Sequence, residues 1–327
     1  MIHSANSQVI LLLCAYLGFS HQSELTPLST REWNTVAKRL QANSIEPEAL
    51  LHAESSWVSE ILEHDQQLAN RISGLLSRSG LLAIELERLE SLGINVITRA
   101  DESYPKRFKQ RLKDSAPALL FYSGNADLLG QTGIAVVGSR NLDEAGKQCA
   151  EFIGNACGLS GLVLYSGGAR GVDSLSMLGA LEARGNAVGI LADSLEKAIR
   201  TQDYRNYLAS QELCLATPYS PSAPFNVGAA MGRNRLIYTL SDYALVIASD
   251  FEKGGTWAGA IEALKAKWIP LFALQHDYMP LGNKKLIERG AISFPHPFQG
   301  HYSELKAWLD SHSSSSGGMQ EQLSLFQ

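Results

Sequence analysis

Three short glycine-containing segments in the middle of the chain have the composition of phosphate-binding turns. They are Val137–Arg140 (VGSR), Ser166–Asp173 (SGGARGVD) and Lys253–Thr256 (KGGT). Each follows a short apolar run typical of a strand and precedes a stretch typical of a helix. In an open parallel sheet, ligands bind beyond the carboxyl ends of the strands, where glycine lets backbone N–H groups approach a phosphate. The three segments therefore predict an anion-binding site, although each alone also fits a plain strand-to-helix turn.

Basic side chains accompany these turns. Arg140 and Arg170 lie within the first two, and Gly232–Arg235 (GRNR) opens another helix. Guanidinium groups match the oxygens of phosphate in geometry and charge. We therefore predict that a phosphate ligand contacts Gly138, Ser139, Arg140, Ser166, Gly167, Gly168, Arg170, Gly171, Asp173, Arg233, Asn234, Arg235, Gly254, Gly255, Thr256 and Lys284.

The sequence lacks the motifs of common catalytic sites. It has no G-x-G-x-x-G fingerprint, P-loop, HExxH helix or G-x-S-x-G turn, and no Cys/His grouping with metal-ligand spacing. Asp173, Asp193, Asp250 and Glu262 could act as bases, yet no spacing pairs them with a nucleophile. We predict no catalytic residues, no metal and no cofactor, and hence a protein that is not an enzyme.

Composition identifies a globular protein. The chain has 327 residues, of which 45% are hydrophobic and 19% charged, and this excludes wholesale disorder. Its 28 basic and 33 acidic residues give a net charge of −5. A site for a polyanion must then be a local patch and not a generally cationic surface.

Cysteine usage favours a reducing compartment. The four cysteines, Cys14, Cys149, Cys157 and Cys214, form no CxxC pair and are too few for a disulfide scaffold. No apolar stretch approaches the length needed to span a bilayer. We expect buried, reduced thiols in a cytoplasmic protein that does not contact membranes.

Hydrophobic periodicity divides the chain into three parts. Residues 1–93 carry helix signals: an apolar run at 9–13, a capping box from Ser29 to Glu32 and a helix-stopping Gly93. Residues 94–310 alternate buried strands with helices, which predicts an α/β domain with a mostly parallel, doubly wound sheet. The expected strands are Ile94–Thr98, Ala118–Tyr122, Ile134–Val137, Leu162–Tyr165, Ala187–Leu191, Leu213–Ala216, Tyr243–Ala248 and Ile269–Leu274.

The third part, residues 311–327, begins as a Ser/Gly-rich stretch typical of a flexible linker. Apolar residues then reappear in the sequence QLSLF. This segment resembles the pentapeptide by which many bacterial replication and repair proteins dock on the DNA polymerase sliding clamp. The resemblance implies clamp contacts through Gln322, Leu323, Leu325 and Phe326.

Taken in order, the loop motifs resemble those of the DNA-processing protein A (DprA/Smf) family. The matching segments are residues 136–140, 166–176, 232–247, 254–263 and 282–291, with a similar approach over 102–125. The resemblance covers about residues 80–292. It implies an extended Rossmann-like fold, single-stranded DNA binding in a basic pocket, a homodimer, and loading of the RecA recombinase during transformation or recombination. A partner or regulator in a defence module is a third interpretation with the same surface chemistry.

Some positions depart from the family pattern. Gly254–Thr256 replaces the family's Ser-Gly-Ser turn, Met231–Gly232 replaces Phe-Pro, and no winged-helix segment follows, so we expect a divergent member. The GGT turn with Glu262 downstream is also similar to the nucleotide-binding turn of lysine-decarboxylase-like phosphoribohydrolases. A nucleotide-binding or nucleotide-cleaving enzyme is therefore the alternative function.

Overall fold

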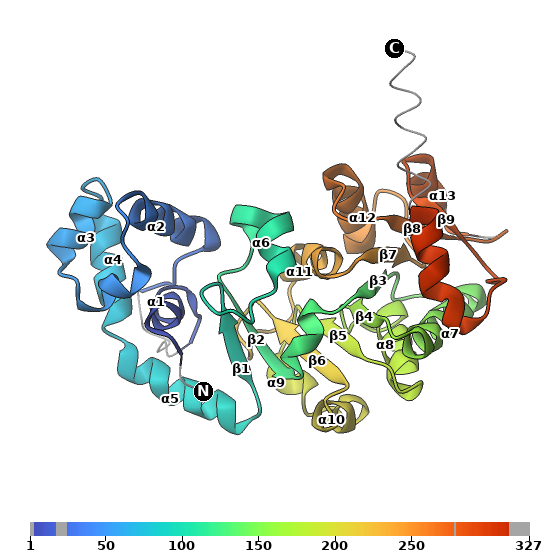
Figure 1. Ribbon diagram of the computed structural model, residues 1–327, viewed down its shortest axis with the longest axis horizontal. Coiled ribbons are helices and arrows are strands. Elements are labelled where there is room, and N and C mark those ends of the chain that lie inside the picture. Colours follow the sequence, from blue (N-terminus) through green and yellow to red (C-terminus); the bar gives the residue numbers. More distant parts are fainter. Residues whose placement is uncertain (1–2, 18–24, 278, 314–327) are drawn as a thin grey trace, which may run out of the picture. The chain divides into compact units, whose positions relative to one another are not determined.

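The computed structural model describes residues 3–17, 25–277 and 279–313, which fall into two compact units. The first unit contains residues up to Ser123 together with 194–196 and 217–223. The second contains 124–193, 197–216 and the residues from Pro224 onward (Figure 1). The first unit extends past residue 93, where we expected the helical domain to end. That domain boundary stays a prediction.

The first unit is mainly helical, as its sequence predicts. The apolar run at 9–13 lies in a buried first helix. The capping box forms, since Ser29 N donates to Glu32 Oε2 at 2.7 Å and Glu32 N donates to Ser29 Oγ at 3.3 Å. Gly93 follows the fifth helix at a φ of +76°, a conformation that glycine adopts without strain. The elements are α1 (Ala5–Cys14), α2 (Thr30–Ala42), η1 (Pro47–His52), α3 (Ser55–Ile61), α4 (Gln66–Leu76), α5 (Ser79–Ser91), β1 (Asn95–Thr98), α6 (Lys106–Leu112), η2 (Lys113–Ser115) and β2 (Leu119–Gly124). Strands β1 and β2 pair antiparallel.

The second unit is built on a parallel sheet. Its strands lie in the order β6-β5-β4-β3-β7-β8-β9, and every pair along this row is parallel. Apart from β6 at one edge, this is the Rossmann strand order. The strands are β3 (Gly133–Val137), β4 (Val163–Ser166), β5 (Ala187–Ile190), β6 (Leu213–Thr217), β7 (Tyr243–Val246), β8 (Leu271–Gln275) and β9 (Ile292–Pro295).

All eight strands predicted from apolar runs are confirmed, together with the Rossmann-like fold class. Strand β9 was missed. It is only partly buried and ends in Pro295, so its sequence lacks the continuous apolar run of a central strand.

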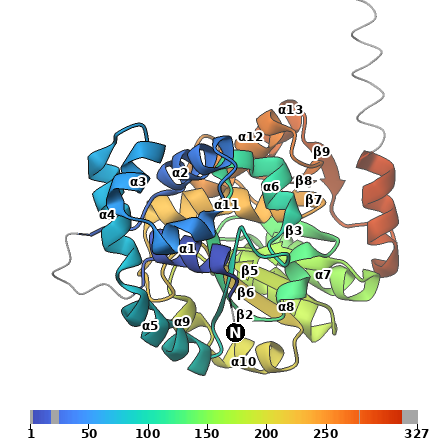
Figure 2. The same cartoon turned by 60° about the vertical axis from the view of Figure 1, so that its left-hand side comes forward.

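Helices cover both faces of the sheet. Helices α7 and α8 pack against each other on one face, and α11 and α12 pack against each other on the opposite face (Figures 1 and 2). This double winding buries the strands on both sides and leaves the loops at their carboxyl ends at the surface. The helices are η3 (Ala126–Gly130), α7 (Glu144–Ser160), α8 (Val172–Glu182), α9 (Leu195–Ala198), α10 (Gln202–Ala209), α11 (Val227–Leu240), α12 (Gly254–Ala266), α13 (Leu281–Glu288) and η4 (Tyr302–Glu304).

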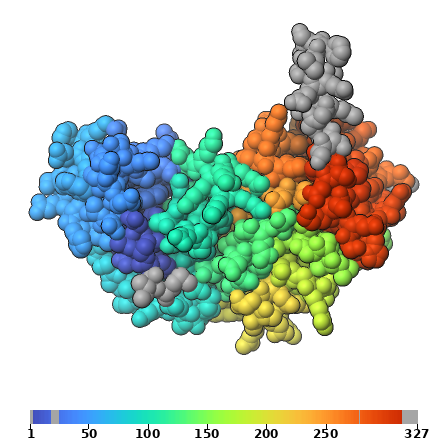
Figure 3. All heavy atoms as spheres, in the orientation of Figure 1, coloured from blue at the N-terminus to red at the C-terminus, as the bar shows by residue number. Residues whose placement is uncertain are grey.

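A last helix, residues 305–313, packs on the β9 side of the sheet. Trp308 meets Phe294 edge to face, with ring centroids 5.1 Å apart, and Tyr302 lies against Phe152 of α7 at 5.0 Å. Figure 3 shows this C-terminal segment, in red, at the surface beside α7.

The linker was expected to start at residue 311, which is wrong for 311–313, because these residues continue the helix. The hydroxyls of Ser311 and Ser313 donate to the carbonyls of Trp308 and Leu309 within the same helix, so these serines do not stop it. The QLSLF segment lies outside the described residues.

The four cysteines are free and buried, as predicted. Burial raises the pKa of Cys149 and Cys214 to about 12. Their thiols therefore stay protonated at neutral pH and pack as small apolar groups. Within the part of the chain that the structure describes, no helix is long and apolar enough to cross a bilayer.

Candidate functional site

A cavity of about 420 Å³ opens where the strand order reverses, between β3 and β7. After β3 the chain continues to β4 on one side of the sheet, and after β7 it continues to β8 on the other side. The loops that follow β3 and β7 therefore diverge and leave a crevice. The loops are joined at their base, where Ile247 N donates to Val137 O at 3.0 Å and Ser139 N to Ala248 O at 2.9 Å. The predicted site residues that line this cavity are Gly138, Ser139, Arg140, Asp173, Arg233, Asn234, Gly254, Gly255 and Thr256.

A buried ion pair forms the floor of the cavity. Arg233 Nη1 of α11 lies 3.9 Å from Asp173 Oδ2 of α8, and both side chains are about nine-tenths buried. Burial raises the pKa of Asp173, and the charge of Arg233 acts in the opposite direction. A Cβ on Gly167 would lie 1.3 Å from Arg233 Nη1, so the glycine leaves the space that the guanidinium occupies.

Arg140 lies at the rim. Its guanidinium carbon is 5.1 Å from the ring centre of Phe225, which precedes α11 and also lines the cavity. The Arg140 backbone passes close to Gly171, where a Cβ would come within 2.7 Å of Arg140 Cα. Gly171 has a φ of +96°, so glycine is required there by conformation as well as by space.

The first turn of α12 also lines the cavity. Gly254 has a φ of +76°, and Lys253 at the N-cap makes no side-chain hydrogen bond to the helix. Asn234 Nδ2 donates to Gly255 O at 2.9 Å and ties this turn to α11. The first backbone N–H groups and the positive end of the helix dipole therefore face the cavity, which is the usual arrangement of an anion site.

The other predicted residues do not line the cavity. Ser166, Gly167, Gly168 and Gly171 lie at the end of β4 and in the loop that follows it, and Ser166 Oγ donates to Val136 O at 2.6 Å. Arg170 is exposed, and Arg235 donates within its own helix to Gly232 O. Lys284 is exposed on α13. The position of a basic residue near a motif in the sequence therefore did not show whether its side chain lines the cavity.

Asn283 is a positioning residue that sequence reasoning missed. Its side chain is fully buried and donates to Ile247 O at 2.9 Å and Leu274 O at 3.1 Å, while its Oδ1 accepts from Ser249 N at 2.9 Å. It therefore holds the loop after β7, which lines the cavity, against β8. The only signal in the sequence is its place in the GNKKLIERGA segment.

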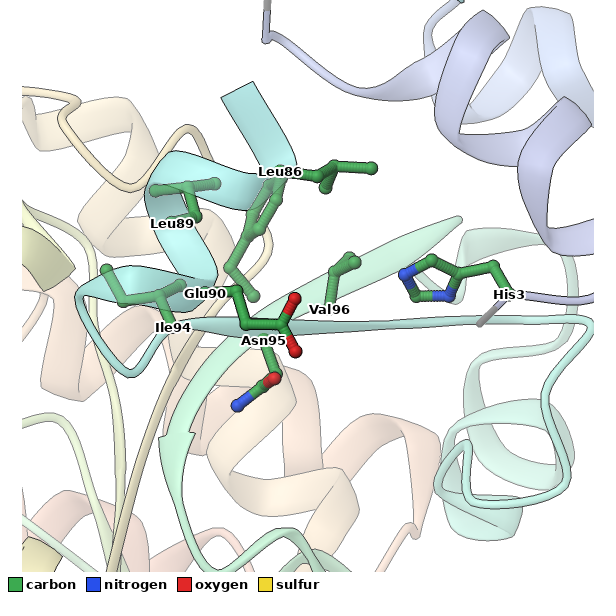
Figure 4. Close-up of a pocket in the computed structure, with 8 residues that line it drawn as sticks. His3, Leu86, Leu89, Glu90, Ile94, Asn95 and Val96 are labelled. Carbon is green, nitrogen blue, oxygen red and sulfur yellow. The ribbon is translucent and has the colours of Figure 1, made fainter. Parts of the chain in front are cut away.

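A second cavity, in the first unit, is much smaller, at about 50 Å³. Figure 4 shows its lining, with Leu86 and Leu89 from α5, Val96 from β1 and His3 from the N-terminal segment. This volume accommodates a few water molecules at most. It is therefore too small to be a ligand site comparable to the switch-point cavity, the name we give to the cavity between β3 and β7.

Comparison with known proteins identifies the family of this chain. The family model of DNA recombination-mediator protein A matches residues 95–299, a range that contains the whole cavity. The chain belongs to this family.

Relatives within the DprA/Smf family are distant. The chain is 29% identical over 205 residues to the DNA processing protein DprA of Bacillus subtilis, covering 61% of this chain and 67% of that protein. It is 26% identical over 218 residues to protein Smf of Escherichia coli, covering 64% and 56%. The chain thus spans about two thirds or less of the length of these curated relatives.

Solved DprA structures share the fold. DNA processing protein A from Streptococcus pneumoniae superposes with a TM-score of 0.67 at 21% identity, over 92% of this chain and 100% of that one. DNA processing protein A from Helicobacter pylori, whose single-stranded DNA binding mode has been described, matches with a TM-score of 0.52 at 27% identity, over 61% and 90%. The Rossmann-like fold of the second unit is therefore that of its family.

Proposed function

We propose that the chain is a single-stranded DNA-binding protein of the DprA type, acting in DNA processing, recombination or defence. The observation that carries the proposal is the cavity itself, in which Arg140, Arg233 and the N-terminus of α12 converge. These groups neutralise and donate to phosphate oxygens, and none of them is arranged to read base edges. The described single-stranded DNA binding of the H. pylori relative supports the same ligand.

The proposed contacts centre on the residues that line the cavity. The sequence-predicted residues outside it, Arg170, Arg235 and Lys284, would extend the path of the strand beyond the cavity. We also propose RecA as a partner, since the family is described as a recombination mediator. A homodimer is proposed from the family resemblance alone. The four free cysteines support a reducing, cytoplasmic setting.

Salt dependence tests DNA binding. Affinity for a short single strand, measured by fluorescence anisotropy, is expected to fall steeply with salt, because each neutralised phosphate releases a counterion. Arg140→Ala should weaken binding and lower the log–log slope by about 0.7, the value for one contact on a single strand. Arg205→Ala, at an exposed residue of α10 that does not line the cavity, is the matched control and should change neither quantity. An unchanged slope for Arg140→Ala would contradict the proposed site.

We further propose that the protein does not turn over nucleotides. Glu262, the residue on which the phosphoribohydrolase alternative rests, does not line the cavity. Asp173 lies there, but its carboxylate is buried in an ion pair with Arg233. Purified protein incubated with nucleoside monophosphates should therefore release no free base. Release that disappears in Glu262→Ala would instead favour the phosphoribohydrolase function.

The sliding clamp is a second proposed partner, favoured by the QLSLF sequence. In such a peptide Gln322 would hydrogen-bond at the rim of a cleft while Leu325 and Phe326 fill apolar pockets, and buried anchors of this kind dominate small interfaces. Clamp binding would bring a DNA-binding protein to sites of DNA synthesis.

A further inference from the structure

A third cavity, in the second unit, has no role in the proposed function. Its volume is about 370 Å³, which is in the range that takes a small organic ligand. It is formed by α12, the loop before α12 and the end of α13, and these two helices lie side by side (Figures 1 and 2). Its lining residues are Glu252, Trp257, Ile261, Leu264, Lys265 and Arg289.

Aromatic rings hold the guanidinium of Arg289 at this cavity. Its central carbon lies 4.8 Å from the ring centre of Trp257 and 5.5 Å from that of Phe251, and the two rings meet edge to face at 5.1 Å. A guanidinium stacked on an aromatic face can still donate from the N–H groups in its plane. Arg289 is also exposed, so a ligand can reach these donors.

The cavity carries more positive than negative charge. Arg289 and Lys265 are exposed cations, whereas Glu252 is the one acidic side chain among the described residues that line it. Glu288, next to Arg289 in the sequence, is paired with Lys285 at 2.7 Å. In a chain with a net charge of −5, two cations at one cavity form a local patch suited to an anion.

An apolar wall lies beside these cations. Ile261 and Leu264, three residues apart, share one face of α12 and are only half-buried. A nucleotide has an anionic phosphate and a base whose faces are apolar, and single-strand binders combine cations with apolar surfaces to hold it. The lining of the third cavity provides both kinds of surface.

The third cavity adjoins the switch-point cavity. Asp250 and Lys253 of the loop after β7 line the switch-point cavity, while Glu252 of the same loop lines the third cavity. In the first turn of α12, Thr256 lines the switch-point cavity and the next residue, Trp257, lines the third. One loop and one helical turn therefore separate the two cavities.

We propose that the third cavity binds a second nucleotide of the same DNA strand, with its phosphate on Arg289 and Lys265 and its base against the apolar wall. This inference rests on the proposed DNA-binding function and extends the DNA site across the loop after β7. A flexible single strand can bend over such a loop, whereas a duplex, with a persistence length of about 150 bp, cannot. The second contact therefore favours single strands.

Strand length tests the proposal. An oligothymidylate of about four nucleotides should occupy the switch-point cavity alone, and one of about ten should reach both cavities. The double variant Arg289→Gln/Lys265→Gln removes two charges and keeps long polar side chains. It should lower affinity for the long strand about tenfold or more, the size of a hydrogen bond to a charged group, and lower its log–log salt slope by about 1.4. Affinity for the short strand should not change.

Trp257 provides a second measurement. Because it lines the third cavity, the long strand should change its fluorescence and the short strand should not. The difference between wild-type protein and Trp257→Phe isolates this signal from that of the other tryptophans. A fluorescence change with the short strand as large as with the long one would contradict the assignment of the two cavities.

The controls separate a local contact from a general effect of charge. Arg200→Gln/Arg205→Gln removes two exposed charges of the same unit that line neither cavity, and should bind both strands as the wild type does. Full affinity of Arg289→Gln/Lys265→Gln for the long strand would overturn the inference and leave the proposed function intact. Equal losses for the two strands would also overturn it, since the short strand cannot reach the third cavity. If neither strand binds wild-type protein, the proposed function fails and this inference fails with it.

Discussion

Arg233→Ala is expected to lower affinity for single-stranded DNA about fiftyfold. Arg233 is 6% exposed, its guanidinium occupies the space beside Gly167, and the residue lines the cavity. Hydrogen bonds to charged groups are worth about 1.5–3 kcal/mol, and pre-positioning a buried group avoids the ordering cost of a mobile surface side chain. Fluorescence anisotropy at fixed salt measures the loss.

The same change should also destabilise the fold. It leaves Asp173 buried without its cation, and removing one partner of a buried pair costs about 3 kcal/mol or more. The double variant Arg233→Ala/Asp173→Ala removes both charges and should regain part of the free energy of unfolding without regaining DNA affinity. Urea denaturation of both variants therefore separates a binding defect from a folding defect.

Arg235→Ala is the matched comparison, because Arg235 is proposed to contact the strand only beyond the cavity. Arg235 lies on the same helix, two residues further on, but does not line the cavity. It should lose much less affinity than Arg233→Ala. Equal losses for the two variants would show that the helix as a whole, and not this cavity, faces the DNA.

Clamp binding is expected to disappear in the double variant Leu325→Ala/Phe326→Ala. Both residues would fill apolar pockets of the clamp, and in a short peptide such anchors supply most of the binding energy. Full-length protein and a peptide of residues 319–327 should bind a purified bacterial clamp with a Kd in the micromolar range, about −8 kcal/mol, by isothermal titration. Loss of both anchors should take binding below detection.

The clamp prediction has two controls within the chain. Met319→Ala changes a flanking residue outside the pentapeptide and should bind normally. Affinity for single-stranded DNA should be the same in the double variant as in the wild type, because the predicted contacts are in different parts of the sequence. Full-length protein that fails to bind the clamp at high micromolar concentration would contradict the prediction, as would a truncation after Ser316 that destabilises the fold.

The sequence by itself determined the strands, the helix caps and the family. A buried parallel strand needs a run of apolar residues, and a helix start needs a residue such as Ser29 whose side chain accepts a hydrogen bond from the backbone. Both signals lie within a few consecutive residues, so the sequence alone shows them. The order of the loop motifs indicated the DprA/Smf family. Local signals were weaker at β9, an edge strand, and at residues 311–313, where serines extend a helix.

Only the tertiary structure decided which of those residues share a site. It brought Arg140 to Phe225 and Arg233 to Asp173, and it placed Arg170, Arg235 and Lys284 elsewhere. Arg233 and Arg235 have the same residue type and nearly the same neighbours in sequence, yet only one lines the cavity. Residues two apart on a helix point to opposite sides, so only one of them can face the crevice. The strand order sets where the crevice opens and hence which side of α11 meets it, and that order depends on the packing of all seven parallel strands and their covering helices together.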